Sequence, residues 1–405
     1  AVDARHKAPS TPMFVVKVAQ HCNLACKYCY MYFRGDQAHL TRPQKLEPDV
    51  AIAFAVRLGE FCHANDFKEV LISLHGGEPL LIGRDRMRQI AGTLRAIEGV
   101  EVSIGVQTNG LLLDDSWYAF FVENNIGYGI SVDGPKHHHD ENRVFTNGSG
   151  SFDRLKGIIT RINDNERARS KFQGVISVLS SHMSAREYFD CMTRELGLQA
   201  FDILMPDANW DNYDEYVPLT QREIFEFYRD LFDIWCQSED RIYIRIFEEL
   251  VRILILGDGG FEAVGGFSAP TVIVETDGQL YAHDVLRMNQ PLVALANVFT
   301  DPIDTIYKNP VYRMASTPFL FEEGFIDDKL GPACRDCDVV QYCKGGFVAH
   351  RYSKRGGYRN RSVHCDALYG LIRHIYAVLE ADVLRNPNRY AALKSKPQSV
   401  FLPFH

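Results

Sequence analysis

The chain has 405 residues, with 44 Lys and Arg against 52 Asp and Glu, and a formal net charge of −8 at pH 7. This acidic balance argues against a nucleic-acid binder, and no stretch approaches the roughly 20 apolar residues that a membrane-spanning helix needs. The first twelve residues lack the apolar segment of a secretory signal. We therefore expect a cytoplasmic protein of two or three domains that binds neither nucleic acid nor membranes.

Strand and helix patterns alternate through the first half of the chain. Strands are expected at 13–19, 69–74, 100–106, 127–132, 172–179 and 200–205. Helices are expected between them at 48–62, 84–97, 116–124, 152–162 and 184–196. This alternation indicates βαβ units with parallel strands, and hence a partial or complete α/β barrel, a choice that periodicity alone does not decide.

The pattern changes after Met205. A polar loop at 207–216 precedes helices at 221–236 and 247–256, and a glycine-rich linker at 257–266 follows them. A β-hairpin is expected at 271–282 around the turn Asp277-Gly278. A cysteine-rich stretch at 334–365 and a helix at 366–384 complete the second half.

Three of the ten cysteines follow the first strand with the spacing C-x3-C-x2-C: Cys22, Cys26 and Cys29. Active sites of α/β barrels lie at the carboxyl ends of the strands, where this loop falls. Three thiolates can hold three irons of a 4Fe-4S cluster and leave the fourth iron open for a ligand. The alternative is a zinc site with His21 or His39 as the fourth ligand.

Further motifs follow the next strands in order. They are His75-Gly76-Gly77-Glu78-Pro79, Gln107-Thr108-Asn109-Gly110, Ser131-Val132-Asp133-Gly134-Pro135 and His139-Asp140-Glu141-Asn142-Arg143. Together with the cysteine loop they resemble the radical SAM enzymes, which have a partial (β/α)6 barrel. The resemblance implies a 4Fe-4S cluster that binds S-adenosylmethionine and cleaves it to a 5′-deoxyadenosyl radical.

The same resemblance implies which residues contact the cofactor. Ser131 and Arg143 are expected at its ribose and carboxylate, and Glu78 at its ammonium group. The full set of expected contacts is Tyr28, Gly76, Gly77, Glu78, Pro79, Gln107, Asn109, Ser131 and Arg143. The run His137-His138-His139 is interpreted as a loop, because consecutive residues point in different directions and rarely share one metal.

A second cysteine pattern, Cys334-x2-Cys337-x5-Cys343 followed by Cys365, resembles the SPASM extension of peptide-modifying radical SAM enzymes. That family has seven cysteines and two auxiliary clusters, whereas this chain lacks cysteines near 268–271, at His283 and at Phe347. Four thiolates suffice for one closed 4Fe-4S cluster, so we expect one auxiliary cluster. A structural zinc site is the alternative. The isolated Cys62, Cys191 and Cys236 are expected to be buried.

The segment Cys343-Lys344-Gly345-Gly346 with His350-Arg351-Tyr352 resembles a narrower group, the FxsB-type SPASM enzymes, which are kin of the three-residue cyclophane synthases. This resemblance implies a maturase of ribosomally made peptides that links a residue's Cβ to an aromatic ring. Asp284 is the candidate proton acceptor; its alternative roles are a turn residue or a partner of Arg287.

Three other functions remain open. They are formylglycine formation in a sulfatase, thioether formation or epimerisation in another peptide, and a non-catalytic iron–sulfur or zinc scaffold. The expected partners are a precursor peptide and a one-electron donor of flavodoxin or ferredoxin type. A leader-binding winged helix does not fit before the first strand, so the precursor is expected to dock directly, for instance on an edge strand of the hairpin, or through a separate leader-binding protein.

The expected organisation has five segments. They are an N-terminal tail (1–12), the barrel (13–206), a helical bridge with linker (207–265), a SPASM-like domain (266–384) and a C-terminal tail (385–405).

Overall fold

The computed structural model describes residues 11–34, 37–257, 271–288, 294–309, 312, 334 and 336–385. The chain divides into two compact units. The first comprises Ala1–Val132, His139–Gly174 and Ala269–Thr317, and the second comprises Asp133–His138, Val175–Ser268 and Pro318–His405. These units divide the chain differently from the five expected segments, whose bounds stay predictions. The expected linker beyond Gly257 and the tail beyond Arg385 lie outside the described residues.

The first unit contains most of the expected βαβ elements. They are β1 (Met13–Ala19), α1 (Pro48–Ala64), β2 (Glu69–Gly76), α2 (Arg84–Arg95), β3 (Glu101–Thr108), α3 (Asp115–Glu123), β4 (Ile126–Ser131), α5 (Phe152–Asp164) and α6 (Glu166–Arg169). Its later segment adds β8 (Thr271–Val274), β9 (Gln279–Tyr281), β10 (Ala296–Asn297) and α11 (Asp304–Lys308).

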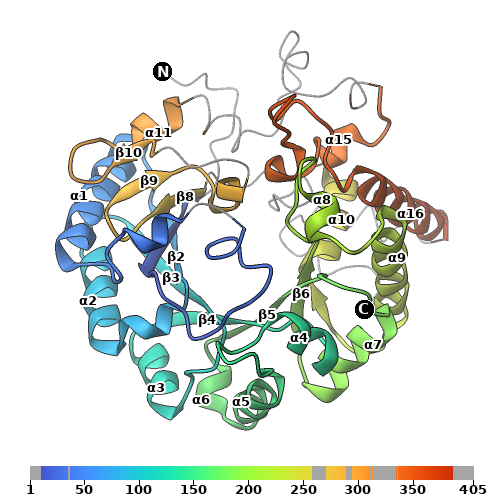
Figure 1. Cartoon of the computed structure of the whole chain (residues 1–405), viewed down its shortest axis with the longest axis horizontal. Coiled ribbons are helices and arrows are strands. Elements are labelled where there is room, and N and C mark those ends of the chain that lie inside the picture. Colours follow the sequence, from blue (N-terminus) through green and yellow to red (C-terminus); the bar gives the residue numbers. More distant parts are fainter. Residues whose placement is uncertain are drawn as a thin grey trace. The chain divides into compact units, whose positions relative to one another are not determined.

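One sheet runs through this unit in the order β10-β9-β8-β1-β2-β3-β4. Strands β1 to β4 are parallel, as the alternating pattern predicted. The expected hairpin is present as β8 and β9, and β8 also pairs in parallel with β1. The hairpin is thus an extension of the same sheet, and it brings residues 271–288 next to the strand that precedes the cysteine loop (Figure 1).

Helices α1, α2 and α3 cover one face of β1 to β4 (Figure 1). Helix α1 begins at Pro48, whose fixed φ suits the first helical position. Its apolar positions bury Phe54 against Phe14 of β1, with the ring centroids 5.5 Å apart. The periodic apolar residues that predicted these elements therefore form the core between helices and sheet.

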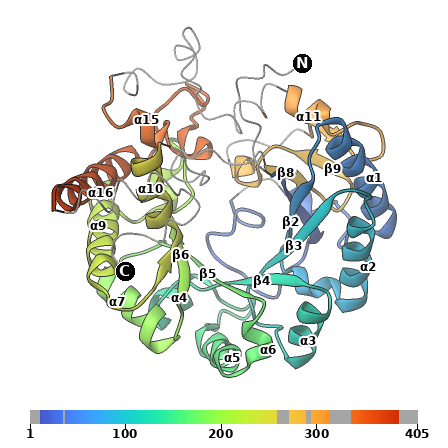
Figure 2. The same cartoon turned by 180° about the vertical axis from the view of Figure 1, so that it is seen from behind.

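The second unit is mostly helical around a short parallel sheet. Strand β5 (Phe172–Val178) begins in the first unit and pairs with β6 (Ala200–Leu204), which pairs with β7 (Tyr243–Ile244). The helices are α7 (Ala185–Asp190), α8 (Tyr213–Tyr216), α9 (Gln221–Gln237), α10 (Arg245–Leu256), α15 (Val340–Cys343) and α16 (Cys365–Arg385). Helix α9 begins with a capping box formed by Thr220 and Glu223, and it lies beside α16 in both views (Figure 2).

Some local expectations were wrong. A loop was expected at His137-His138-His139, but these residues lie in a helix, α4 (Lys136–Asn142). The helix was missed because this short polar segment has no apolar periodicity. The expected loop at 207–216 ends in α8. The helix expected at 184–196 is present, as α7 followed by the π-helix Cys191–Glu195. Cys62 and Cys191 are buried as expected, but Cys236 is only half-buried.

No helix in the described part of the chain is long and apolar enough to cross a membrane.

The turn after β2 depends on two glycines. The backbone of this turn continues the pairing with the end of β1, because Gly77 N–H donates to the Ala19 carbonyl and Glu78 N–H to the His21 carbonyl. A Cβ on Gly76 (φ +145°) would collide with the Ala19 carbonyl, and one on Gly77 with the His21 carbonyl and the Tyr32 hydroxyl. The glycines therefore let the turn approach the cysteine loop itself.

Substituting Gly77→Ala should destabilise the first unit by about 1–3 kcal/mol, the usual cost of overpacking a tight contact. The matched control is Gly92→Ala in α2, where nothing lies within 4 Å of the added methyl and where Ala favours the helix. Chemical unfolding of both variants checks this expectation. Equal stability of the two variants would contradict the assigned role of Gly77.

Candidate functional site

The cysteine loop follows β1 and is held by backbone hydrogen bonds to residues 142–145. Ala25 N–H donates to the Val144 carbonyl at 2.8 Å, and Lys27 N–H donates to the Asn142 carbonyl at 3.1 Å. Cys22, Cys26 and Cys29 are half-buried. Burial raises the pKa of the Cys22 thiol to about 12, and the neighbouring thiols of Cys26 and Cys29 contribute to this rise. The three sulfurs are thus close enough to act on one another.

Two donors point at the sulfur of Cys22. The Leu24 N–H lies 3.4 Å from it, and the Asn109 side-chain amide lies 3.7 Å from it. The Asn109 amide also donates to the Asn23 side chain at 2.7 Å. Hydrogen-bond donors at a cysteine sulfur stabilise its thiolate form, which is the form that binds iron.

Glu78 connects the ends of β2 and β3. Its carboxylate accepts hydrogen bonds from Leu80 N–H, the Thr108 hydroxyl and Asn109 N–H, and its side chain is fully buried. Burial raises the pKa of Glu78 to about 7 despite these three donors. The residue fixes Asn109 beside the cysteine loop, whereas its expected contact with a cofactor ammonium stays a prediction.

Other expected cofactor contacts form two pairs. The Arg143 guanidinium lies over the Tyr28 ring at 5.4 Å from its centroid, and its charge also acts on Cys29. The Gln107 side-chain amide donates to the Ser131 hydroxyl at 3.0 Å, which joins the ends of β3 and β4. Tyr28, Arg143, Gln107 and Ser131 all belong to the first unit with the cysteine loop.

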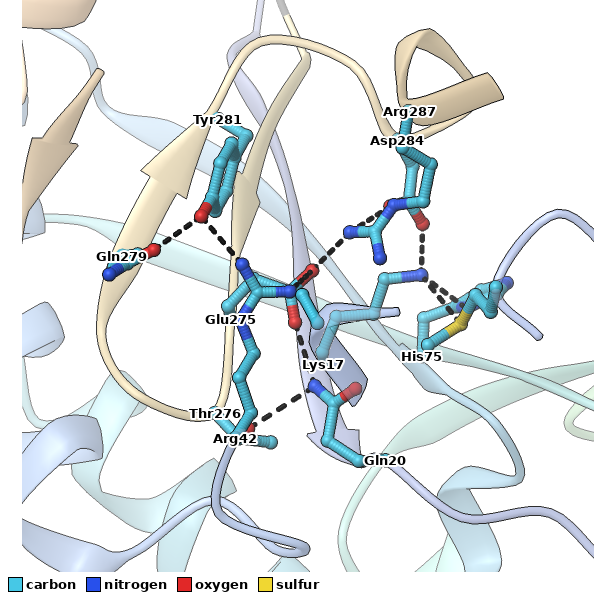
Figure 3. A network of polar contacts seen from close by, with 12 residues as sticks. Lys17, Gln20, Arg42, His75, Glu275, Thr276, Gln279, Tyr281, Asp284 and Arg287 are labelled. Atoms are coloured by element: carbon cyan, nitrogen blue, oxygen red, sulfur yellow. Dashed lines mark hydrogen bonds and ion pairs between the residues drawn. The ribbon is translucent and has the colours of Figure 1, made fainter. Parts of the chain in front are cut away.

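Asp284 lies in an ionic network that is mostly buried (Figure 3). A hydrogen bond from Tyr30 connects this network to the cysteine loop. It begins the 3-10 helix Asp284–Met288 after the hairpin, and its carboxylate forms ion pairs with Lys17 of β1 and with Arg287, the latter at 2.9 Å. The Tyr30 hydroxyl, one residue after Cys29, donates to the same carboxylate at 2.7 Å. Two of the roles expected for Asp284, proton acceptor and partner of Arg287, are compatible with this position.

The network continues away from Asp284 through alternating charges. Arg287 also pairs with Glu275, and Glu275 lies 3.5 Å from a guanidinium nitrogen of Arg42. Arg42 then pairs with Asp277 at the hairpin turn, at 3.2 Å. On the other side, Lys17 Nζ lies 3.2 Å from His75 Nδ1 (Figure 3). Three cations and three carboxylates thus balance one another, all of them buried except Asp277, which is partly exposed at the hairpin turn.

This balance sets the protonation state of Asp284. Burial alone would raise the pKa of its carboxyl, but the charges of Lys17 and Arg287 outweigh burial and hold the pKa well below its usual range. Burial and the charge of Asp284 raise the pKa of Tyr30, which keeps its hydroxyl a donor. Asp284 is therefore a carboxylate at any ordinary pH.

The second cysteine set lies in the second unit, around α15 and the start of α16. Burial raises the pKa of Cys343 to about 12, and the charges of Cys334, Cys365 and Cys337 contribute to this rise. These four thiols therefore act on one another electrostatically, although the residues come from segments up to about thirty residues apart. Ser268 and the two residues after it lie outside the described residues, and His283 is half-buried after the hairpin.

Among the described residues, no three His, Cys, Asp or Glu side chains converge on one point that could hold a single metal ion. An iron–sulfur cluster makes a different demand, because each cysteine sulfur binds its own iron at a separate corner of the cube. Neighbouring thiols with donors directed at a sulfur meet that demand. The donor set at Cys22, Cys26 and Cys29 therefore fits the expected cluster.

Sequence reasoning missed most of the ionic network. The sequence pattern places Lys17 in an expected strand and predicts no functional role for it. It predicts no role for Tyr30, Arg42 or Glu275 either. The available signal was a lysine within the otherwise apolar strand MFVVKVA, because a buried charge needs a partner.

Comparisons with known proteins bear on the family and the fold of this chain. Residues 16–175 match the family model of the Radical SAM superfamily. Over 370 residues the chain is 23% identical to a cysteine-type anaerobic sulfatase-maturating enzyme of Clostridium novyi strain NT, an alignment that covers 88% of this chain and 93% of the relative.

Two solved proteins resemble the structure. "Native anSMEcpe with bound AdoMet" matches with a TM-score of 0.77 and 22% identity over 93% of this chain and 100% of that one. Streptococcus suis SuiB bound to its precursor peptide SuiA matches with a TM-score of 0.59 and 16% identity over 89% of this chain and 77% of that one. The first likeness confirms the expected fold class, an α/β partial barrel with a C-terminal extension.

The buried network predicts a strong effect of removing one charge. Lys17→Met should destabilise the protein by about 3–5 kcal/mol, because it removes one of the two cations that offset the buried charge of Asp284 and leaves only Arg287. The exposed pair Arg167–Glu123 offers the matched control, and Arg167→Met should cost no more than about 1 kcal/mol.

A double variant makes the test specific. Lys17→Met combined with Asp284→Asn should lower the free energy of unfolding by less than the sum of the two single changes. The reason is that the second substitution removes the carboxylate charge whose partner the first one removed. Chemical unfolding measures all four variants. Strict additivity would contradict the coupling of Lys17 to Asp284.

Proposed function

We propose that this chain, a radical SAM enzyme related to the anaerobic sulfatase-maturating enzymes, oxidises a side chain within a peptide substrate. One observation carries the proposal: an ionised carboxylate, Asp284, accepts a hydrogen bond from Tyr30, the residue that follows the last cysteine of the candidate cluster loop. The candidate proton acceptor and the candidate cluster-binding loop are therefore connected within the first unit.

The residues for the cofactor are those that the resemblance implied. Cys22, Cys26 and Cys29 would hold three irons of a 4Fe-4S cluster, and S-adenosylmethionine would bind the fourth. When bound, this pair supplies a 5′-deoxyadenosyl radical that removes a hydrogen atom from the substrate. The proposed contacts of S-adenosylmethionine are Tyr28, Gly76, Gly77, Glu78, Pro79, Gln107, Asn109, Ser131 and Arg143.

Asp284 has the properties of a proton acceptor in this chemistry. A substrate radical that becomes a closed-shell product must lose one proton and one electron. Asp284 is ionised before the reaction, so it can take the proton without first losing its own. Lys17 and Arg287 also lower its basicity, so the group that it deprotonates must be strongly acidic.

Two products are consistent with the same first steps. Formylglycine formation from Cys or Ser is supported by the sulfatase-maturating relatives, which align with about nine-tenths of the chain. A link between Cβ and an aromatic ring is supported by the cysteines missing at His283 and Phe347 and by the resemblance to FxsB-type enzymes. We favour formylglycine-type oxidation, because the similarity behind it extends over more of the chain.

Cys334, Cys337, Cys343 and Cys365 would hold one auxiliary 4Fe-4S cluster, because four neighbouring thiols match its four ligands. The partners are a peptide and a one-electron donor of flavodoxin or ferredoxin type. Peptides are also bound in structures of anSMEcpe, with Cp18Cys peptide, and of SuiB, with SuiA. A separate leader-binding protein remains a further candidate partner.

Two peptide series distinguish the products. One carries a sulfatase-type Cys or Ser, and the other carries aromatic residues near aliphatic ones. After anaerobic reaction with S-adenosylmethionine and reductant, formylglycine formation gives an aldehyde that a hydrazide captures. Crosslinking instead gives a loss of two hydrogens without an aldehyde. Deoxyadenosine release with no change in any peptide would contradict peptide oxidation.

Asp284→Asn should lower product formation by about 10²–10⁴-fold, the usual contribution of a positioned base, while deoxyadenosine release continues. Asp277→Asn is the matched control, because Asp277 belongs to the same ionic network but lies at the partly exposed hairpin turn. It should retain product formation. Mass spectrometry of the peptide and chromatography of deoxyadenosine measure the two outcomes. Full product formation by Asp284→Asn would contradict its role.

A further inference from the structure

A strongly basic segment precedes the last cysteine of the second set. Residues 344–361 contain six Lys and Arg residues and no Asp or Glu, whereas the whole chain has a net charge of −8. Within it, the basic loop (353–361) exposes Lys354, Arg355 and Arg359. In the described part of the chain no carboxylate forms an ion pair with any of these three side chains. Their charges are therefore available to a partner.

The basic loop is held in one shape by its own backbone and by a neighbouring loop. Ser353 and Gly357 exchange two backbone hydrogen bonds, of 2.9 and 2.8 Å. The Asn360 side-chain amide donates to the Ser353 hydroxyl and to the Gly357 carbonyl, both at 3.0 Å. The Lys354 N–H donates to the Asp211 carboxylate at 2.7 Å. A surface that is ordered beforehand loses less conformational freedom when a partner binds.

Exposed aromatic side chains flank the basic loop. Trp210 is 44% exposed, its indole N–H donates to the Arg361 carbonyl at 2.7 Å, and the Arg361 guanidinium lies 5.8 Å from the centroid of its ring. Arg361 also pairs with Asp366 of α16 at 2.8 Å, and Tyr369, three residues further along this helix, is 41% exposed. Trp, Tyr and Arg are the side chains that contribute most often to binding energy at protein interfaces. Composition and charge thus indicate an interface for an acidic protein.

The same surface adjoins the second cysteine set. Cys365 begins α16 and Tyr369 follows it at a spacing of four residues, so both lie on one side of the helix. Arg373, one further turn along, pairs at 2.9 Å with Asp338, the residue after Cys337. Cys337 and Cys365 are half-buried rather than buried. Two of the four proposed cluster ligands therefore lie at the margin of this exposed surface.

We propose that the basic loop, together with Trp210 and Tyr369, is the docking surface for a small acidic electron carrier of flavodoxin or ferredoxin type. Opposite charges attract the carrier and orient it on this face. The carrier takes up the one electron that the substrate radical loses through the proposed auxiliary cluster, and the proton goes to Asp284. The carrier is thus reduced as the substrate is oxidised. The inference rests on the proposed function and deepens it, because it names the place where the electron leaves.

The test measures binding of oxidised flavodoxin, a small acidic flavoprotein, to the reconstituted holoenzyme by titration calorimetry. The variant combines Lys354→Gln, Arg355→Gln and Arg359→Gln. At low salt its dissociation constant should rise by at least about tenfold, because it removes the charges that attract the carrier. At about 1 M salt, where the Debye length is about 3 Å, the variant and the unaltered protein should bind flavodoxin alike.

A matched control removes the same charges elsewhere. Lys68→Gln, Arg88→Gln and Arg167→Gln also replace one lysine and two arginines, and all three side chains are more than half exposed. They belong to the first unit, and their combined loss should change the dissociation constant by no more than about twofold. Dithionite, a small reductant that needs no docking surface, should reduce the auxiliary cluster of all three proteins equally, as measured by electron paramagnetic resonance.

The outcomes separate the docking surface from the function on which it rests. Equal flavodoxin affinity of the basic-loop variant and the unaltered protein at low salt would overturn the surface, as would equal weakening by the control. Weaker binding of the peptide substrate with unchanged flavodoxin binding would assign the basic loop to the peptide, and would also overturn the proposal. Zinc, or no metal, at the second cysteine set after Cys22→Ala, Cys26→Ala and Cys29→Ala would overturn the auxiliary cluster itself.

Discussion

The candidate site depends on the buried ion pair between Lys17 and Asp284. Lys17 belongs to the strand that ends in the cysteine loop, whereas Asp284 follows a hairpin much later in the chain. The parallel pairing of β8 with β1 brings the two segments together, and the charges then lock them at one point. Without the pair, Lys17 would lose its carboxylate partner in the protein interior and Asp284 would keep only Arg287 as a cation, so moving either segment alone is costly.

The cysteine loop is fixed by its neighbours in a similar way. Gly76 and Gly77 let the turn after β2 contact the backbone of Ala19 and His21, and Glu78 then fixes Asn109 beside Cys22. Several residues that the family resemblance assigns to the cofactor thus have protein partners of their own. A motif residue can bind the cofactor directly or hold the binding loop in shape, and Glu78 is engaged in the second task in this structure.

Both cysteine sets have buried or half-buried cations as electrostatic neighbours. Lys17 and Arg143 act on Cys29, and Arg351 acts on Cys334. Thiolates are costly in the protein interior, and fixed cations offset part of that cost before any metal binds. Cations therefore act on cysteines of both units.

The sequence predicted what depends on local pattern. The parallel strands β1 to β4, the hairpin and the long helices followed from periodicity and turn residues, and the cysteine loop followed from spacing. The pairing of β8 with β1 was not predicted, because a parallel contact between distant segments leaves no local trace. For the same reason Lys17 could be recognised as unusual within an apolar strand, but its partner could not be named. Short elements such as α4 and β7 contain too few residues to produce a periodic signal.

The most direct test of this account is the iron and sulfide content of anaerobically reconstituted protein, measured together with deoxyadenosine release from S-adenosylmethionine under reductant. The account predicts about eight irons per chain, about four after the three cysteines of the first loop are replaced by Ala, and deoxyadenosine only from the unaltered protein. Zinc in place of iron, or the absence of deoxyadenosine from the fully loaded protein, would contradict radical chemistry and leave a metal-stabilised binding protein.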